Sequence, residues 1–514
     1  MTPRRRAPRP LAFLVGLVAA AIALPAIAIS ADAAVSRASQ PAAAGLAALG
    51  PPQQQTLLRY ARDTWASLAA MTDPRSGLPA DALNSDGTTS VQTSTTNIGA
   101  YMWSTLVSDR LGIITHADAV SRLGKTLATL GKMERDKASG QFYNWYDHST
   151  GKKLTAWPPS GAPLTPILSS VDNGWLATGL HVIASSVPEV AAKAQALYDS
   201  MDFSVYYRPA VNRIAFYVAP ERVVPPGFDR SPCCYDTIVS ESRIASYIGI
   251  ANGQLSPKEY FGAWRTFPAT CDWSWQETQP VGFNRTYLGV NVFEGAYPYN
   301  GTRVVPGWGG SMFEALMPSL FVPEDKWGPQ SWAINHPLTV AAQIHHGLVE
   351  AGYGYWGFSP SNIPEGGYDA YGVDAIGMNP DGYPSNEDNT MVDNGSGTCG
   401  RAPTPAPPPS AYTNGVVTPH ASFLGLRDAP GATMANLAKL ERNFSIYGAW
   451  GFHDSVNVQT GRVSSSYLSL DQGIIMASVG NALGHDLLRN AFATQQFHDA
   501  LQPVISIEQF NAGS

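Results

Sequence analysis

Apolar residues recur every three to four positions in several stretches of the chain, which is the spacing of amphipathic helices. Leu123, Leu127 and Leu130 follow this pattern, and so do Val190 and Leu197 after the helix-opening Pro188. Further helices are predicted over Ile244–Ala251 (ending near Gly253), from Ser256-Pro257-Lys258-Glu259, which resembles a capped helix start, and over 338–350, 433–443 and 471–491.

Long connections rich in Gly, Pro, Asn and Tyr separate these helices. Repeated helices with long aromatic loops indicate a helical toroid in which the loops build a cleft at one end. The periodicity equally allows an α-solenoid, although no internal repeat of fixed length supports one. Residues 373–415 form the longest loop-like segment and include the proline-rich run 402–409, and a loop of this length is typically functional or disordered.

The first 33 residues have the pattern of an export signal. Four arginines precede an apolar run over 11–29, and Ala31-Asp32-Ala33 supplies a small-x-small cleavage site. We therefore expect a signal peptide over 1–33, an Ala-rich tether over 34–50 and one catalytic domain over 51–514. The protein is then secreted or extracytoplasmic, with no membrane attachment after cleavage. An uncleaved membrane anchor is the alternative, because the run is barely long enough to span a bilayer.

Charge and aromatic content narrow the class of partner. Cleavage after Ala33 removes four arginines and one aspartate, which changes the formal net charge from −7 to −10. An acidic chain argues against nucleic acid as a partner and disfavours an anionic polysaccharide. The chain also has 13 Trp and 22 Tyr, whose flat faces and polar tips suit sugar rings. A large aromatic core explains most of them equally well.

Four cysteines, Cys233, Cys234, Cys271 and Cys399, allow three disulfide pairings. Outside the cytoplasm such bonds form and persist, and neighbouring cysteines seldom bond each other. We therefore expect Cys271 and Cys399 each to reach one of the neighbouring pair. A zinc site is the alternative, but no His–Cys spacing supports it.

Carboxylates in aromatic surroundings are the main candidates for chemistry, because glycoside hydrolysis needs one acid and a second carboxylate. Glu241 stands just before an apolar helical stripe, Glu314 lies within an apolar run, and Glu365 lies in a Gly- and Pro-rich turn. Each also has a structural interpretation, as a helix-dipole partner, a buried ion pair or a solvated loop acid respectively. Asp172 could equally cap a helix, and Asp236 and Asp369 are further candidates.

No metal or other cofactor is expected. His345 and His346 are adjacent and point to different sides of a helix. The acidic stretch over 381–393 has oxygen ligands that suit calcium but lacks the EF-hand spacing. Serine-nucleophile, Walker and Rossmann patterns are also missing from the sequence.

An ordered set of short blocks over about 90–480 resembles bacterial glycoamylase-like domains related to the endo-β-1,2-glucanases of glycoside hydrolase family 144. The same domain type occurs in cyclic β-1,2-glucan synthases. No single block is decisive, but the order is specific. Besides the stretches around Glu241 and Glu314, the blocks are Thr96-Asn97-Ile98-Gly99, Phe142-Tyr143-Asn144-Trp145-Tyr146-Asp147, Val171-Asp172-Asn173-Gly174, Trp356-Gly357-Phe358-Ser359, Val417-Thr418-Pro419-His420-Ala421, Tyr447-Gly448-Ala449-Trp450-Gly451-Phe452-His453-Asp454 and Leu470-Asp471-Gln472-Gly473.

The resemblance implies an all-α fold, an (α/α)6 toroidal barrel with a cleft at one end, that cuts glucans at a glycosidic bond. Asp172, Glu241 and Glu314 fall on family positions that carry acids. Glu365 stands where stand-alone members carry an Asp-Gly-Pro-Asp-Gly-Tyr-like turn, which reads Ile-Pro-Glu-Gly-Gly-Tyr here. The segment 373–415 is longer than usual, which puts the β-1,2 linkage in doubt. The export signal fits a secreted hydrolase better than a membrane-bound transglycosylase.

The sequence therefore predicts a secreted hydrolase of a neutral β-glucan, preferably β-1,2-linked, that acts by carboxylate acid/base catalysis with inversion. Alternatives are a transglycosylase, a hydrolase of an arabinan or galactan, and a non-catalytic glycan-binding protein. Glu241 and Glu365 are the expected reacting pair, with Glu314 as the third catalytic candidate. The expected substrate-binding residues are Asp172, Tyr143, Trp145, Asp236, Arg243, Trp308, Trp356 and Tyr368.

Overall fold

The computed structural model describes residues 49–221, 224–267, 279–378 and 408–513. The expected signal peptide, most of the tether, the acidic stretch 381–393, Cys271 and Cys399 lie outside these residues. Within them, no helix is both long enough and apolar enough to cross a membrane.

Helices dominate the structure, in agreement with the predicted all-α class, and they fall into two sets by burial. One set is buried almost all round: α4 (Thr95–Arg110), α6 (Ser170–Ser186), α8 (Arg243–Ala251), α10 (Met312–Leu316), α13 (Pro419–Leu424) and α15 (Ser469–Leu483). The longer helices of the other set bury only one face: α3 (Pro51–Met71), α5 (His116–Leu130), α7 (Pro188–Asp199), α12 (Trp332–His345), α14 (Pro430–Asn443) and α17 (Gln495–Ile505). Short helices complete the described set: α9 (Lys258–Gly262), α11 (Glu324–Trp327) and α16 (Leu487–Phe492).

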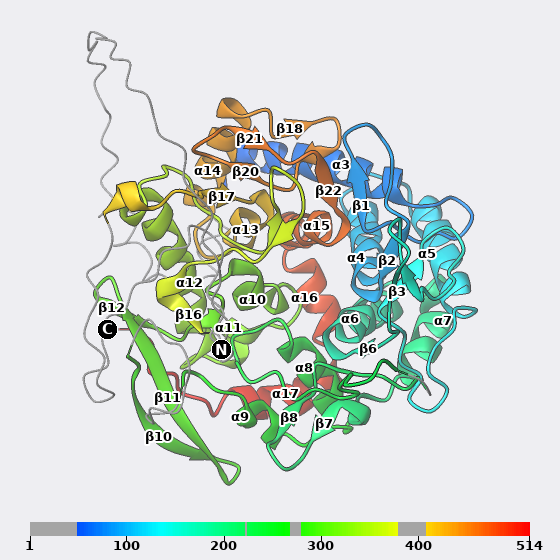
Figure 1. The fold of residues 1–514 in the computed structure, drawn as a ribbon, viewed down its shortest axis with the longest axis horizontal. Coiled ribbons are helices and arrows are strands. Elements are labelled where there is room, and N and C mark those ends of the chain that lie inside the picture. Colours follow the sequence, from blue (N-terminus) through cyan, green and yellow to red (C-terminus); the bar gives the residue numbers. More distant parts are fainter. Residues whose placement is uncertain (1–48, 222–223, 268–278, 379–407, 514) are drawn as a thin grey trace, which may run out of the picture.

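The buried helices pack directly on one another. Helix α4 contacts α6 and α15, α6 contacts α8, and α15 contacts α13. Figure 1 shows α15 between α13 and α4, so the C-terminal part of the chain closes against the N-terminal part. A one-sided helix follows or precedes each buried one along the chain, and it covers the buried set from outside.

Glycines allow this close packing. A Cβ atom on Gly99 of α4 would lie 2.6 Å from the carbonyl oxygen of Trp175 in α6. A Cβ atom on Gly473 of α15 would lie 2.6 Å from the Cβ of Ala100. Both distances are shorter than any real carbon contact, so a larger residue would force these helices apart.

Strands are short and lie in the connections between helices. The longest are β10 and β11, which pair antiparallel, and β12 joins them on the far side of β11. This hairpin projects from the helical body at the lower left of Figure 1. The described strands are β1 (Ala82–Asn84), β2 (Gln92–Ser94), β3 (Trp145–Asp147), β4 (Ala156–Trp157), β5 (Ala162–Pro163), β6 (Leu168–Ser169), β7 (Tyr207–Arg208), β8 (Arg213–Ile214), β9 (Tyr217–Val218), β10 (Val281–Tyr287), β11 (Val290–Tyr299), β12 (Thr302–Val304), β13 (Gly307–Trp308), β14 (Ser361–Asn362), β15 (Tyr368–Asp369), β16 (Gly377–Met378), β17 (Val416–Val417), β18 (Tyr447–Gly448), β19 (Gly451–Phe452), β20 (Val456–Asn457), β21 (Arg462–Val463) and β22 (Ser466–Leu468).

The predicted one-sided helices are confirmed with shifted ends. Helix α12 begins six residues before the expected residue 338, and it carries Pro337 inside it before a π-helical turn over His346–Glu350. The single helix expected over 471–491 is two helices, α15 and α16, because the chain turns at Gly484 and adopts positive φ angles at His485 and Asp486.

The disulfide differs from the expectation. Cys233 is bonded to its neighbour Cys234 across a cis peptide bond, with their Cα atoms 3.1 Å apart. The expectation assumed a trans peptide, in which consecutive Cα atoms are farther apart. The predicted bridges from these two cysteines to the later loops are therefore not formed.

Candidate functional site

Glu241 and Glu314 lie against each other, although 73 positions separate them in the sequence. Glu241 precedes α8, where its carbonyl accepts from the N–H of Ile244, and Glu314 is in the first turn of α10. The backbone N–H of Glu241 donates to Oε2 of Glu314 at 2.8 Å. On the other side, Nε1 of Trp175 donates to Oε2 of Glu241 at 2.6 Å. The structure thus brings two of the three predicted catalytic acids together.

The electrostatics of this pair favour a proton on Glu241. Burial raises the pKa of the Glu241 carboxyl well above its usual value, and the charges of Glu314 and Asp172 raise it further. The Trp175 N–H and the Arg243 charge act in the opposite direction. Burial also raises the pKa of Glu314, but the N–H of Glu241 that it accepts stabilises its carboxylate form. The pair can therefore hold one proton, with Glu241 as its acid member.

Asp172 joins this group from the first turn of α6. Thr96 Oγ1 donates to Asp172 Oδ1 at 2.5 Å. With the amide of Asn144 oriented to satisfy both its ends, this residue donates to Asp172 Oδ2 at 2.7 Å and accepts from Trp145 Nε1 at 2.8 Å. Burial raises the pKa of Asp172, and the hydroxyls of Ser169 and Thr96 oppose the shift.

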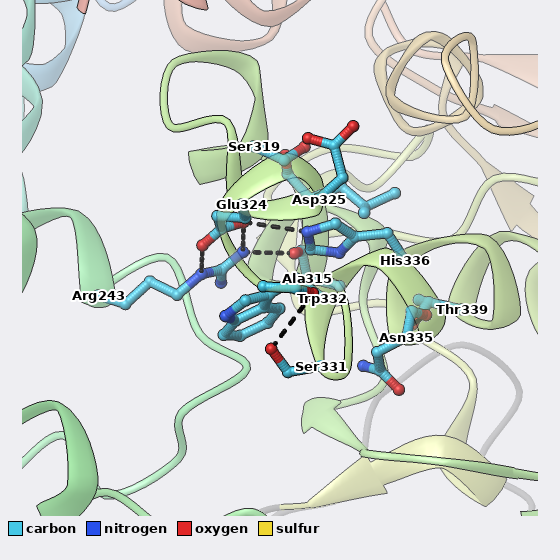
Figure 2. Close-up of polar contacts among 12 residues, drawn as sticks. Arg243, Ala315, Ser319, Glu324, Asp325, Ser331, Trp332, Asn335, His336 and Thr339 are labelled. Carbon is cyan, nitrogen blue, oxygen red and sulfur yellow. Dashed lines mark hydrogen bonds and ion pairs between the residues drawn. The ribbon is translucent and has the colours of Figure 1, made fainter. Parts of the chain in front are cut away.

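Arg243 holds the two glutamate segments in place from behind. Its Nη1 donates to the carbonyls of Ser240 (2.8 Å) and Glu314 (2.9 Å). Its Nη2 donates to the carbonyl of Ala315 at 2.6 Å. The remaining donors form a two-pronged ion pair with Glu324, at 2.7 and 3.1 Å (Figure 2).

All five N–H groups of a guanidinium are thereby used. Arg243 is only 2% exposed and packs over the ring of Trp332, 4.6 Å from the ring centre. The prediction that it binds substrate has no support in this arrangement, because no donor is left to offer. It is a positioning residue, and sequence reasoning missed its partner Glu324.

Glu324 is buried, and donors surround it. His336 contacts its Oε2 at 3.0 Å (Figure 2), and the Tyr247 hydroxyl donates to its Oε1 at 2.7 Å. Burial alone would raise its pKa, but the charge of Arg243 and the hydrogen bonds of its neighbours outweigh burial and lower the pKa to about 2. Glu324 therefore stays ionised, and its negative charge offsets part of the effect of the Arg243 charge on Glu241.

Tyr368 lies at the solvent-facing side of the same group. Its side chain is 59% exposed, yet the pKa of its hydroxyl is raised well above the usual value by surrounding protein and by the charges of Asp471, Asp454 and Glu241. The exposure shows that much of this residue is open to solvent, and these charges place its hydroxyl near the acids. Contact of Tyr368 with sugar stays a prediction.

Trp308 is half-buried in an aromatic group with Tyr235 and Phe216, at ring-centre distances of 5.7 and 6.1 Å. Burial and the charges of Glu241, Glu314 and Asp172 raise the pKa of Tyr235 well above its usual value. This aromatic group is therefore next to the predicted acids, and it leaves part of Trp308 accessible.

The other predicted site residues differ in how far their side chains are exposed to solvent. Glu365 is on the exposed turn between β14 and β15, where its carboxylate is 44% exposed and 3.9 Å from Arg462. Trp356 is 1% exposed, so its ring cannot stack on a sugar in this conformation. Tyr143 is buried under the ammonium of Lys153, which is 4.0 Å from the ring centre.

Trp145 and Asp236 are both half-buried. The ring of Trp145 packs edge-on against Trp157 at 5.1 Å. Asp236 lies near Arg213, whose pKa is lowered by burial and raised by the charge of this aspartate.

A second group of buried acids was missed by the sequence reasoning. Asp454, Asp471 and His420 offer ligand atoms that all lie within 4.8 Å of one another. Burial and the neighbouring Asp471 raise the pKa of Asp454 well above its usual value, and burial raises that of Asp471 to about 7. Burial lowers the pKa of His420 to about 4. Asp81, which accepts from Asn97 Nδ2 at 2.8 Å, also acts on Asp471.

A pattern in the sequence could have pointed to one member of this group, Asp471. Asn97, Asp172 and Asp471 are each followed two positions later by a glycine, Gly99, Gly174 and Gly473 respectively. Each polar residue is the third of its buried helix and each glycine the fifth. The pattern marks the start of a buried helix that points a polar group out of its first turn.

Two internal cavities are too small for a sugar. Cavities of about 20 Å³ (beside Arg427 and Arg489) and about 10 Å³ (beneath Tyr235 and Arg243) occur in the described part of the chain. Each holds at most a single water.

Two family models match parts of the chain. One, described as "Putative glucoamylase" (Glycoamylase), matches residues 281–496, and the other, described as a protein of unknown function, matches residues 59–208. The resemblance to glycoamylase-like domains is thereby confirmed for the C-terminal part, which carries Glu314, Asp454 and Asp471.

One curated relative is the cyclic β-(1,2)-glucan synthase NdvB of Rhizobium meliloti, which is 26% identical over 319 residues. This match takes in 58% of the chain, which spans only 9% of the length of that relative.

Solved structures share the fold at low identity. The endo-β-1,2-glucanase of Chitinophaga pinensis, in complex with sophorotriose and glucose, has a TM-score of 0.62 at 18% identity, with 89% of this chain and 98% of that one covered. The β-1,2-glucanase of Parabacteroides distasonis gives 0.62 at 16%, covering 90% and 60%. A variant endo-β-1,2-glucanase of Talaromyces funiculosus, in complex with β-1,2-glucan, gives 0.59 at 13%, covering 92% and 95%.

Proposed function

We propose that this chain is a glycoside hydrolase that cleaves a neutral β-glucan, preferably β-1,2-linked, by carboxylate acid/base catalysis. The observation that carries the proposal is the Glu241 carboxyl, which is held by Trp175 beside the carboxylate of Glu314. Its raised pKa keeps it protonated at a pH where an ordinary glutamate is ionised. A protonated carboxyl is what the leaving glycosidic oxygen needs.

In this proposal Glu241 is the general acid. Glu314 is the ionised member of the pair in this proposal: the Glu241 N–H stabilises its carboxylate form, and its charge keeps the proton on Glu241. The charge of Asp172 also raises the pKa of Glu241, by a smaller amount. The aromatic rings of Tyr368 and Trp308 are exposed or half-exposed beside these acids and would stack on sugar rings.

We retain Glu365 as the proposed second member of the reacting pair. Its carboxylate is accessible to water, which a general base must be, and it shares a turn with Tyr368. An inverting reaction needs roughly 6.5–9.5 Å between the two carboxyls to admit a water. Inversion therefore requires that Glu365 and Glu241 lie on opposite sides of the bound sugar.

The proposed architecture is an (α/α)6 toroid. Six buried helices, each accompanied by a one-sided outer helix, support it, as do the structural relatives. The polar first turns of α4, α6, α10 and α15 would then open into a cleft at one end. We also propose that the protein is exported, on the sequence of residues 1–33.

The first experiment incubates the purified protein with linear β-1,2-glucan and a panel of other neutral glycans, and follows reducing ends and product sizes. Glu241→Gln and Glu365→Gln are expected to lower kcat by roughly 10²–10⁴-fold, and Glu189→Gln, an exposed acid on α7, serves as the matched control. Nuclear magnetic resonance of the first product anomer tests inversion. Cleavage of another glycan alone would refute the proposed substrate, and full activity of Glu241→Gln would refute the proposed acid.

A transglycosylase is the second candidate, and the match to part of a cyclic β-(1,2)-glucan synthase favours it. A transglycosylase passes the cleaved glycan to a sugar hydroxyl instead of water. Longer or cyclic products from linear β-1,2-glucan, without a matching rise in reducing ends, would therefore establish this alternative over the hydrolase.

A further inference from the structure

Two partly exposed tryptophans, Trp145 and Trp157, lie against each other near the start of a buried helix. Trp145 opens β3, and its partner across the antiparallel pairing with β2 is Ser94, the residue that caps α4. Trp157 is in β4, which pairs with β5 in a short hairpin. The two rings meet edge to face, with centres 5.1 Å apart and planes at 86°.

Trp145 is linked to the proposed acids through one amide. With Asn144 oriented to satisfy both its ends, its oxygen accepts from Trp145 Nε1 at 2.8 Å and its nitrogen donates to Asp172 Oδ2 at 2.7 Å. Asp172 in turn is one of the charges that act on Glu241. The N–H end of the Trp145 ring is therefore two hydrogen bonds away from a member of the acid group.

Packing of the hydrophobic core does not account for these two rings. In the described part of the chain, the core includes Trp103 and Trp175, and half-buried side chains such as Trp450 pack against it. Trp145 and Trp157 belong neither to that core nor to the half-buried side chains packed on it. Neighbouring apolar side chains that the core does not use favour a contact surface for a ligand.

The chain around Trp157 is uncharged. Residues 154–168 include no acidic or basic side chain, although most of the residues over 155–163 are exposed. Thr155 and Ser160 add hydroxyl groups to this surface. Flat rings and hydroxyls without charge fit a neutral sugar. A nucleic acid, by contrast, requires basic side chains.

We propose that Trp145 and Trp157 form an outer subsite, which binds a sugar unit of a neutral glucan chain at a distance from the bond that is cleaved. The inference rests on the proposed glycoside hydrolase function for the class of its ligand. Asn144 connects the subsite to Asp172, so one chain can contact both places. The subsite adds affinity for long chains and none for chains too short to reach it.

The backbone holds the subsite in place before a ligand binds. The carbonyl of Trp157 accepts the N–H of Gly161 at 2.8 Å, which closes the β4–β5 hairpin. The N–H of Leu154 donates to the carbonyl of Trp145 at 3.0 Å, which ties the start of the hairpin to β3. Binding to a surface that is already ordered costs less conformational entropy.

The first test measures binding apart from cleavage. Protein with Glu241→Gln is titrated by calorimetry with linear β-1,2-glucan, with β-1,3- and β-1,4-linked glucans and with the matching disaccharides. Adding Trp157→Ala should weaken binding of the long chain about tenfold, because the apolar area of one ring is lost. Binding of the disaccharide should not change. Trp157→Tyr keeps a flat ring and should retain most of the affinity.

A matched control removes an exposed ring elsewhere. Phe283 is 42% exposed on β10, in the hairpin that projects from the helical body (Figure 1). Phe283→Ala should leave glucan binding unchanged. In the catalytically active protein, Trp157→Ala should lower kcat/KM for the long glucan about tenfold and leave kcat/KM for the shortest cleaved oligosaccharide unchanged. A folding defect would lower both.

The outcomes separate this proposal from the hydrolase proposal. Glucan binding that depends on Trp157, without cleavage of any glycan, would refute the hydrolase alone. Equal affinity with and without Trp157→Ala, or no binding of any glucan, would overturn the subsite. Loss of a dimer in Trp157→Ala, with glucan binding intact, would make the two rings an interface between copies and also overturn it.

A second measurement decides if Trp157→Ala does not fold. Protein with Glu241→Gln is crystallised with a long oligosaccharide of the glucan that binds. A sugar ring against Trp157 supports the subsite, and its absence there refutes it.

Discussion

One carboxyl group, that of Glu241, owes its raised pKa to its surroundings. Burial favours its neutral form, and the carboxylate of Glu314 adds to this through its negative charge. The Arg243 charge acts in the opposite direction, and its ion pair with Glu324 offsets part of that action. Glu314, Arg243 and Glu324 thus all influence the proton on Glu241, and none of them needs to touch a sugar.

Replacement of Glu314 tests this dependence. In Glu314→Gln the side-chain oxygen can still accept the Glu241 N–H, but the charge is lost. The pKa of Glu241 should fall, so activity, which needs the protonated acid, should be lost at a lower pH than in the unmutated protein. The alkaline limb of kcat/KM against pH measures this shift. Asp172→Asn should move the limb less, since its charge is the weaker influence. An unmoved limb in Glu314→Gln would contradict the assignment of the acid.

Glu259 offers a test of stability against pH away from the proposed site. It is buried in α9, where Ser246 Oγ donates to its Oε1 at 2.9 Å, and burial raises its pKa to about 7. Because the folded state holds this proton more tightly than the unfolded chain, its contribution is complete below about pH 4.5 and is lost as pH rises through 7. This shift corresponds to about 3 kcal/mol.

Glu259→Gln should therefore remove part of the decline in stability between pH 5 and pH 8. Urea unfolding at both values, for the variant and the unmutated protein, measures the difference. Equal pH dependence in the two proteins would show that Glu259 is not protonated on folding. Glu134→Gln, at an exposed acid, is a suitable control.

Residue type and local pattern predicted the acids better than the binding residues. Glu241 and Glu314 could be singled out because an acid in an apolar run requires a reason. Arg243 and Trp356 were predicted to face substrate, and both are buried. Nothing in their local sequence distinguishes an arginine that clamps two carbonyls from one that meets a ligand, because its partners Glu324 and Ala315 are more than 70 positions away.

At the scale of helices, one arrangement recurs. The third residue of α4, α6, α10 and α15 is Asn97, Asp172, Glu314 and Asp471 respectively. A side chain at this position projects from the helix start, where the helix dipole favours negative charge. Four buried helices therefore present a polar group at their N-terminal ends, and three of these groups are acids.

Replacing a glycine that lies two positions after one of these polar residues tests how closely the buried helices pack. Gly99→Ala should destabilise the protein by roughly 1–3 kcal/mol, because its Cβ would meet the Trp175 carbonyl at 2.6 Å. Gly124→Ala in α5 is the matched control: its Cβ would meet only the Val190 side chain at 4.0 Å. Ala should there stabilise the helix by roughly 0.5–1 kcal/mol. Chemical denaturation of both variants measures the contrast, and equal effects would contradict the close packing.

Helices with one apolar face were predicted more completely than the buried ones. Helices α5 and α7 have the spacing of three to four that marks a face. Of the buried set, α8 and α15 were predicted, although the end of α15 was not. Helices α4 and α13 were not predicted, because buried helices carry apolar and small residues at nearly every position and no period stands out.

At the scale of the whole molecule, buried charges tie distant parts of the chain together. Arg265 Nε donates to Glu508 Oε1 at 2.6 Å, and the Tyr260 hydroxyl also contacts Glu508. Both charged side chains are fully buried. The C-terminal segment after α17 is thereby fixed against the segment after α9.

Glu508→Gln should leave the Arg265 charge buried without its partner. Losing one member of a buried pair costs roughly 3–5 kcal/mol. We expect the lower end of this range, because Glu294, whose pKa is raised to about 8 by burial and by Glu508, can ionise and compensate in part. Urea unfolding measures the loss. Asp499→Asn, at an exposed acid of α17, should change stability by less than about 0.5 kcal/mol, and an equally small effect of Glu508→Gln would refute the anchoring role.

The anchoring of Arg243 has a consequence for the outcome of the reaction. One guanidinium holds both the segment that carries Glu241 and the start of α10, so these two acids keep their positions relative to each other. In the proposed reaction, the stereochemistry then depends on where the remaining carboxylate stands relative to this pair. A shift of that carboxylate alone could convert an enzyme that inverts the anomeric centre into one that retains it, with the acid and the groups that set its pKa left in place. If relatives differ in product stereochemistry, the causative changes are expected in the loop that carries the second carboxylate. Arg243 and Glu324 are expected to stay the same.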